Sequence, residues 1–148
     1  MRAWSALLVA HRRLTATLDV ELRAGSDLTL DEYDVLHQLA RAGEPIRMSE
    51  LAGQVLISRP TTTRVVDRLV ERGWVARLRD GSDRRVVRVA LTDDGRAVLR
   101  AAARIHLDGI ARLFEAPLTP ARLHALGDAL ELVIAAAIDA DDSSHGSV

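Results

Sequence analysis

The sequence predicts a mainly α-helical protein that carries one small β-hairpin. Apolar residues recur with helical spacing through most of the 148 residues. Two short runs, 74–78 and 86–91, have the composition of strands and are joined through Asp80-Gly81. Between residues 47 and 92 the order is helix, turn, helix, strand, charged loop, strand. This order is the outline of a winged helix-turn-helix domain, here with further helices at both ends of the chain.

The first two helices are predicted from their apolar periodicity and their end signals. Residues 3–23 form the first helix, and the segment 25–27, Gly-Ser-Asp, ends it. Thr29 can cap the second helix, with Glu32 three residues later completing a capping box. The segment 42–45, Ala-Gly-Glu-Pro, closes this helix.

A short third helix over about residues 48–55 leads through the turn Leu56-Ile57 into a fourth helix. Ser58 caps the fourth helix, and Pro60 is tolerated in its first turn because the N–H there has no helical partner. Gly73 ends it. Its predicted buried stripe consists of Val65, Val66, Leu69 and Val70.

After the hairpin, Thr92 caps a long helix that Ala116-Pro117 breaks, and Thr119-Pro120 starts the last helix. We therefore predict a winged helix-turn-helix lobe over residues 29–92 and a disordered polar tail over 141–148. The helices in 1–28 and 97–140 hold more apolar surface than so small a domain can bury. They are predicted to be dimerisation helices, the alternative being a monomeric helical cap.

Composition excludes several functional classes. The absence of Cys excludes disulfides, Cys-ligated zinc and thiol redox sensing by this chain. The five His residues have no metal-ligand spacing, and the sequence has no phosphate-binding Gly-rich loop or nucleophile elbow. We expect no enzyme activity, no metal and no cofactor. No stretch approaches membrane-spanning length, and no targeting segment is convincing, so a cytoplasmic protein is expected.

The charge is distributed unevenly. The chain as a whole has a net charge of −1, but residues 58–88 hold nine Arg against four acidic residues, which gives +5 locally and −6 elsewhere. Affinity for phosphate follows local cationic density. The segment that holds the fourth helix and the hairpin is therefore the predicted nucleic-acid-binding surface.

Several motifs in this order resemble the multiple-antibiotic-resistance regulator (MarR) family, and the resemblance spans about residues 3–140. The motifs are Met48-Ser49-Glu50-Leu51-Ala52, Ser58-Arg59-Pro60-Thr61, Val66-Asp67-Arg68-Leu69 with Arg72-Gly73, Asp83-Arg84-Arg85, and Leu91-Thr92 with Gly95. Leu56 departs from the Gly that many helix-turn-helix sequences have near this position. The resemblance implies a homodimeric, sequence-specific transcriptional regulator, in most cases a repressor, that binds an inverted-repeat operator in double-stranded DNA.

The candidate DNA contacts begin at the start of the fourth helix. Ser58 and the free N–H groups of the first turn can hold a phosphate at the positive end of the helix dipole. Arg can bond guanine O6 and N7, and Thr can bond a base edge or touch a thymine methyl group. The residues with these capacities outside the buried stripe are Arg59, Thr61, Thr63 and Arg64, with Arg68 one turn deeper as a phosphate ligand. The alternative is a solvated helix face.

Two further sets of contacts are expected. Ser49 either touches a phosphate or only begins its helix. In the wing, the resemblance implies that Arg85 enters the minor groove while Asp83 orients it, and that Arg79 and Arg84 contact the backbone. The alternative is an ordinary charged hairpin turn.

The resemblance also implies a cleft for a small aromatic or phenolic ligand between the lobe and the dimer helices. The candidate ligand-binding residues are Trp4, His11, Tyr33 and His37, whose alternative role is core packing. A different functional class, a winged-helix protein–protein adaptor without sequence-specific DNA binding, remains the alternative. Retention of Arg59, Arg64, Asp83 and Arg85 argues against it.

We predict that Arg85→Ala weakens operator binding about tenfold or more, since a minor-groove arginine benefits from concentrated negative potential. A fluorescence titration at physiological salt measures this, with light scattering to verify an intact dimer. An unchanged dissociation constant would remove the wing from the interface.

Overall fold

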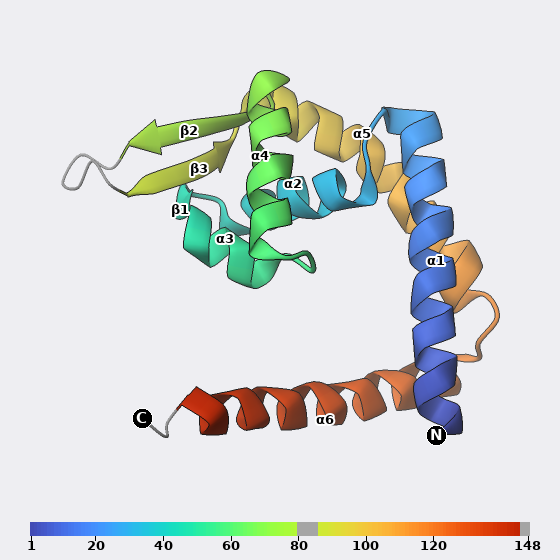
Figure 1. Cartoon of the computed structure of the whole chain (residues 1–148). Coiled ribbons are helices and arrows are strands. Elements are labelled where there is room, and N and C mark those ends of the chain that lie inside the picture. Colours follow the sequence, from blue (N-terminus) through green and yellow to red (C-terminus); the bar gives the residue numbers. More distant parts are fainter. Residues whose placement is uncertain (80–85, 146–148) are drawn as a thin grey trace. The chain divides into compact units, whose positions relative to one another are not determined.

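The computed structural model describes residues 1–79 and 86–145, and its elements follow the predicted order (Figure 1). The chain divides into two compact units, Met1–Gly109 and Ile110–Val148. The elements are α1 (Arg2–Ser26), α2 (Leu30–Ala42), β1 (Ile46–Arg47), α3 (Met48–Gln54), α4 (Arg59–Glu71), β2 (Val75–Arg79), β3 (Val87–Leu91), α5 (Asp93–Ile110), a π-helical segment η1 (Ala111–Glu115) and α6 (Pro120–His145). The predicted class, mainly helical with a small β-hairpin wing, is confirmed.

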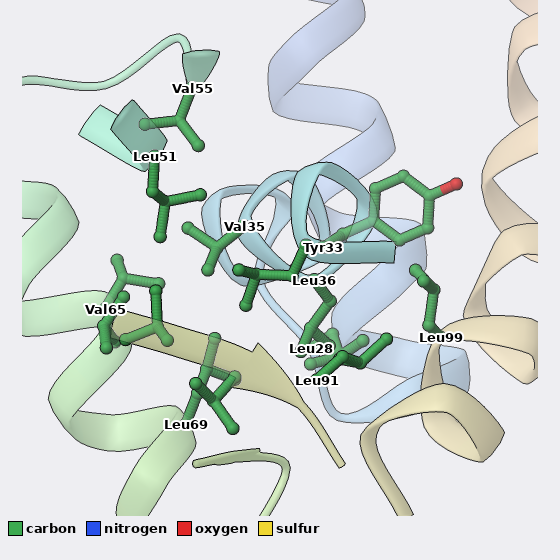
Figure 2. Close-up of a cluster of buried hydrophobic side chains, with 14 of the residues drawn as sticks. Leu28, Tyr33, Val35, Leu36, Leu51, Val55, Val65, Leu69, Leu91 and Leu99 are labelled. Carbon is green, nitrogen blue, oxygen red and sulfur yellow. The ribbon is translucent and has the colours of Figure 1, made fainter. Parts of the chain in front are cut away.

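Helix α2 lies at the centre of the first unit and is covered by α3, α4 and the sheet. Figure 2 shows Val35 and Leu36 of α2 facing Leu51 of α3 and Val65 of α4, and all four side chains are buried. The remaining fully enclosed members of this core include Leu22, Leu28, Val66, Leu69 and Val89. Burial of each such side chain contributes about 1.5–3 kcal/mol, so α2 derives its position chiefly from this apolar contact.

The hairpin belongs to a three-stranded antiparallel sheet with the order β1-β3-β2. The sequence did not predict β1, because two residues are too short to show the alternation that marks a strand. Ile46 of β1 pairs with Val89 of β3, and both side chains are buried. This small strand joins the end of α2 to the wing before the chain enters α3.

Capping interactions determine where the helices begin. Thr29 Oγ1 accepts a hydrogen bond from Glu32 N at 3.0 Å, and Glu32 Oε2 accepts one from Thr29 N at 2.9 Å, which confirms the predicted capping box. Thr92 Oγ1 accepts from Gly95 N at 3.0 Å at the start of α5. Gly43, with φ of 70°, ends α2 in the left-handed conformation that glycine adopts without strain.

The C-terminal unit differs from the prediction in two respects. Helix α6 continues to His145, whereas the sequence predicted a disordered tail from residue 141. Residues 141–145 contain neither Gly nor Pro, so nothing in them stops an established helix. The chain also adopts the π-helical turn Ala111–Glu115 before the break at Pro117, a feature that apolar periodicity does not signal.

Gly95 provides a test of the packing between α5 and the hairpin. A Cβ at this position would collide with the backbone oxygen of Trp74 and lie 2.9 Å from Leu91 Cδ1. We expect Gly95→Ala to lower the free energy of unfolding by about 1–3 kcal/mol. Gly53 in α3 has open space around its Cα, so Gly53→Ala should leave stability unchanged or raise it by about 1 kcal/mol. Urea titrations of both variants would show this contrast, and equal effects would contradict it.

Candidate nucleic-acid interface

The first turn of α4 is organised by Ser58. Its side-chain oxygen accepts a hydrogen bond from Thr61 N at 3.4 Å and lies 2.8 Å from the Thr61 hydroxyl oxygen. Thr62 turns inward, is fully buried and donates from Oγ1 to Ser58 O at 3.0 Å. Because Pro60 has no N–H and Thr62 N donates to Ser58 O at 2.8 Å, Arg59 N is the backbone donor of this turn that has no partner among the described residues, at the positive end of the helix dipole.

The outward side of α4 carries Arg59, Thr63 and Arg64, all of them exposed, while Thr61 is half-buried. The guanidinium groups of Arg59 and Arg64 have no hydrogen bond or ion pair with any residue in the described part of the chain. Two charged side chains five residues apart on α4 are thus available to an anionic partner.

Arg68 has a different environment from the one the sequence suggested. Its Nε donates to Glu32 Oε1 at 3.2 Å, and its side chain is 49% exposed while that of Glu32 is 5% exposed. The sequence predicted a phosphate contact for Arg68, which stays a prediction. The structure adds an internal ion pair that joins α4 to α2.

Strand β2 of the hairpin also contacts α4. Arg77 of β2 forms an ion pair with Asp67 of α4 at 2.7 Å, which neutralises the carboxylate closest in sequence to the exposed arginines. Arg79 is exposed at the end of β2. The predicted wing residues Asp83, Arg84 and Arg85 lie outside the described residues.

The helix before α4 presents Ser49, which is exposed in its first turn. The N-cap of α3 is Arg47 and not Ser49. Arg47 N donates a hydrogen bond to Glu50 Oε2 at 2.8 Å. Its predicted phosphate contact stays a prediction. The turn between α3 and α4 is held by Asp34, whose Oδ2 accepts from Leu56 N at 3.0 Å.

Of the four predicted ligand residues, the structure brings two together. The rings of Tyr33 and His37 are stacked with centroids 6.0 Å apart, and His106 of α5 lies against Tyr33 at 4.4 Å. Trp4 and His11 are exposed on α1, and neither joins this aromatic cluster in the contacts of the described residues. The sequence analysis missed His106, since only the fold brings α5 against α2.

The aromatic cluster of Tyr33, His37 and His106 is a perturbed environment for proton binding. Burial lowers the pKa of His106, the charge of His37 lowers it further, and Asp34 acts in the opposite direction. Burial also raises the pKa of Tyr33, with a smaller contribution from Asp34. Nδ1 of His106 is buried without a hydrogen-bond partner among the described residues. Most buried polar atoms in folded proteins have a hydrogen-bond partner, so this atom marks the cluster as an unusual part of the core.

Two other kinds of site are not found. Within residues 1–79 and 86–145, no group of three His, Asp or Glu side chains is placed to hold a metal ion. No helix in the described ranges is long and apolar enough to cross a membrane.

A short helix, a capped exposed helix and a hairpin, arranged on a common core, define the winged helix-turn-helix class. The MarR family model matches residues 28–87. The chain is 32% identical to Sco3205, a MarR family transcriptional regulator from Streptomyces coelicolor solved in complex with DNA; the match covers 89% of this chain and 83% of that chain, with a TM-score of 0.83. The chain belongs to the MarR family of transcriptional regulators, as its motifs suggested.

Two more relatives extend the comparison. BpsR from Bordetella bronchiseptica, whose DNA binding is regulated by 6-hydroxynicotinic acid, is 26% identical over 90% of this chain and 98% of that chain, with a TM-score of 0.79. PecS from Dickeya dadantii (strain 3937), an HTH-type transcriptional regulator, is 35% identical over 83 residues, which are 55% of this chain and 50% of PecS. The chain thus matches about half the length of this curated relative. These relatives are regulators, in agreement with the prediction that the chain is not an enzyme.

The environment of His106 predicts a pH dependence of stability. Its pKa is lowered from 6.5 in the folded state, so the unfolded chain binds a proton more readily and stability declines as the pH falls below about 6.5. His106→Phe, which retains a ring against Tyr33, should remove part of this decline. Urea unfolding at several pH values between about 7 and 5 would measure it.

The control for this prediction is His124→Gln, because His124 is 84% exposed on α6. This variant should keep the wild-type pH dependence. An identical loss of slope in both variants would contradict the assignment to His106.

Proposed function

We propose that this protein is a homodimeric, sequence-specific DNA-binding transcriptional regulator that represses its target genes from an inverted-repeat operator. The observation that carries the proposal is the exposed start of α4, where Arg59 and Arg64 flank the Ser58 cap without partners in the described structure. Thr63 lies beside them. These groups can bond guanine, thymine and phosphate. The family membership and the DNA complex of Sco3205 support this assignment.

Exposed apolar residues on the terminal helices support dimerisation. Leu132, Val133, Ile134 and Ile138 of α6 are each more than half exposed, and Trp4 of α1 is 59% exposed. Apolar surface on this scale is characteristic of a subunit interface. A two-fold dimer would place two copies of α4 in successive major grooves about 34–36 Å apart, which requires an inverted repeat in the DNA.

Release by a small aromatic or phenolic acid is the regulatory part of the proposal. Tyr33 and His37 offer a ring and an imidazole, and the unpaired Nδ1 of His106 adds a polar group. The regulation of BpsR by 6-hydroxynicotinic acid is a precedent within the set of relatives. Coupling of about 1–3 kcal/mol would change operator affinity about 5–150-fold. Such a regulator acts where the chromosome is, in the cytoplasm.

Selection of bound duplexes from a random pool tests DNA recognition. We expect enrichment of an inverted repeat, and a steep linear fall of log affinity with log salt concentration for the selected duplex. Light scattering of the complex should give two chains per duplex. No enrichment, with only weak salt-labile binding, would refute sequence-specific recognition and favour the protein–protein adaptor.

Arg64→Ala should weaken binding to the selected duplex about tenfold and reduce discrimination at the base that Arg64 contacts. Arg41→Ala removes an equally charged, exposed side chain from the last turn of α2, outside the predicted DNA contacts and dimerisation helices, and serves as the matched control. It should retain wild-type affinity. Equal losses in the two variants would show that α4 contributes only nonspecific charge.

A further inference from the structure

We propose that Glu32 and Asp34, two carboxylates on α2, are positioning residues that fix the recognition helix α4 near its C-terminal end and just before its N-terminal end. The inference rests on the proposed DNA binding by α4. It concerns how α4 is oriented for that task, and neither carboxylate is proposed to touch DNA.

The first contact is made by Glu32, which is 4% exposed. Its Oε1 accepts from Arg68 Nε at 3.2 Å, and its Oε2 accepts from Thr29 N at 2.9 Å and lies 3.8 Å from Arg72 NH1. A buried carboxylate has lost most of its hydration and is stable only when it is paired and hydrogen-bonded. Displacement of Arg68 relative to α2 therefore takes the nearest cation away from a buried charge, which restrains the last turns of α4.

Arg72 extends this restraint to the end of α1. Its NH2 lies 2.6 Å from Asp27 Oδ2 and its NH1 donates to Asp27 O at 3.1 Å. The guanidinium also stacks on the ring of Trp74, 3.8 Å from the centroid. The C-terminal end of α4 is thus joined to the α1–α2 junction on one side and to the start of the hairpin on the other.

The second contact is made by Asp34 at the opposite end of α4. Asp34 Oδ2 accepts from Leu56 N at 3.0 Å, and Oδ1 accepts from Gln38 Nε2 at 3.2 Å. The Leu56 side chain is 90% exposed, so its packing cannot hold the turn in place. Val55 and Ile57 on either side pack against the core, and the hydrogen bond to Asp34 adds a directional restraint on the backbone between them, two residues before the Ser58 cap.

Glu32 and Asp34 lie within three residues of each other on α2. A movement of α2 would therefore displace both ends of α4 together. The side chains that face the DNA, Arg59, Thr63 and Arg64, do not contact either carboxylate in the described structure. Loss of the contacts should therefore alter the direction of α4 more than its choice of bases. In a dimer, that change appears as altered tolerance for the spacing between the two half-sites.

The variants distinguish the effect of the Glu32 charge from that of the Asp34 hydrogen-bond acceptor and from that of helix capping alone. Glu32→Gln keeps an oxygen for Thr29 N, because Gln also completes a capping box, but it removes the charge that holds Arg68 and Arg72. Asp34→Ala removes the acceptor for Leu56 N, while Asp34→Asn retains one. Glu50→Gln is the matched control, because Glu50 caps α3 by accepting from Arg47 N at 2.8 Å.

Each variant is titrated with duplexes that carry the selected half-sites at the preferred spacing and at spacings changed by one or two base pairs. We expect Glu32→Gln and Asp34→Ala to reduce the preference for the best spacing about fivefold, within the usual range of coupling between linked sites, without changing the base preferences of a half-site. Asp34→Asn and Glu50→Gln should behave as wild type. Thermal unfolding and light scattering establish that each variant is a folded dimer. If Glu32→Gln does not fold, the Asp34→Ala and Asp34→Asn pair decides.

If Glu32→Gln and Asp34→Ala prefer the same half-site spacing as wild type, and to the same degree, the inference is overturned and the proposed function stands. An equal change in Glu50→Gln would also overturn the inference. A wild-type protein that selects no duplex would overturn the proposed function and this inference with it.

Discussion

Burial of the Glu32 carboxylate constrains the lobe more specifically than its apolar core does. Apolar contact between α2, α3 and α4 supplies most of the attraction that holds these helices together, but the attraction itself is nearly non-directional and needs no partner at a defined atom. An ion removed from water needs partners at defined positions. One Glu32 oxygen caps α2 through Thr29 N, and the other binds Arg68 of α4, so the start of one helix and the end of another are fixed by a single side chain.

A second set of ion pairs bears on how a chain with a net charge of −1 can present a cationic surface. The arginines of α4 divide into two groups. Arg68 is paired with a buried carboxylate, and Asp67 is neutralised by Arg77 from the hairpin. Arg59 and Arg64 lie at the other end, without described partners and close to the positive end of the helix dipole. The pairing of Asp67 with Arg77 thus offsets the carboxylate nearest in sequence to Arg64 and leaves the uncompensated positive charge at the start of the helix.

Signals that are local in sequence were sufficient to predict most of the fold. The capping box of Thr29 and Glu32 and the cap at Ser58 each involve residues three apart, so their spacing is visible without a structure. The pairing of Glu32 with Arg68 joins residues 36 positions apart and could not be predicted from spacing. The same holds for His106 beside Tyr33, which depends on how α5 packs against α2. Strand β1 was missed for a different reason, its length of two residues.

Helix α2 carries Tyr33 and His37 of the aromatic cluster together with the two positioning carboxylates, and this shared location gives a physical basis for the proposed regulation. Asp34 bonds the Leu56 N–H before α4, and its charge also raises the pKa of His106, opposing the effect of burial. A proton on His106, or an acidic ligand beside it, therefore changes the electrostatic environment of the group that restrains the turn. Because Glu32 lies two residues away on the same helix, any resulting shift of α2 reaches both ends of α4. Regulation by this route requires only a small differential affinity between two positions of α2, since about 1.4 kcal/mol changes a binding equilibrium tenfold.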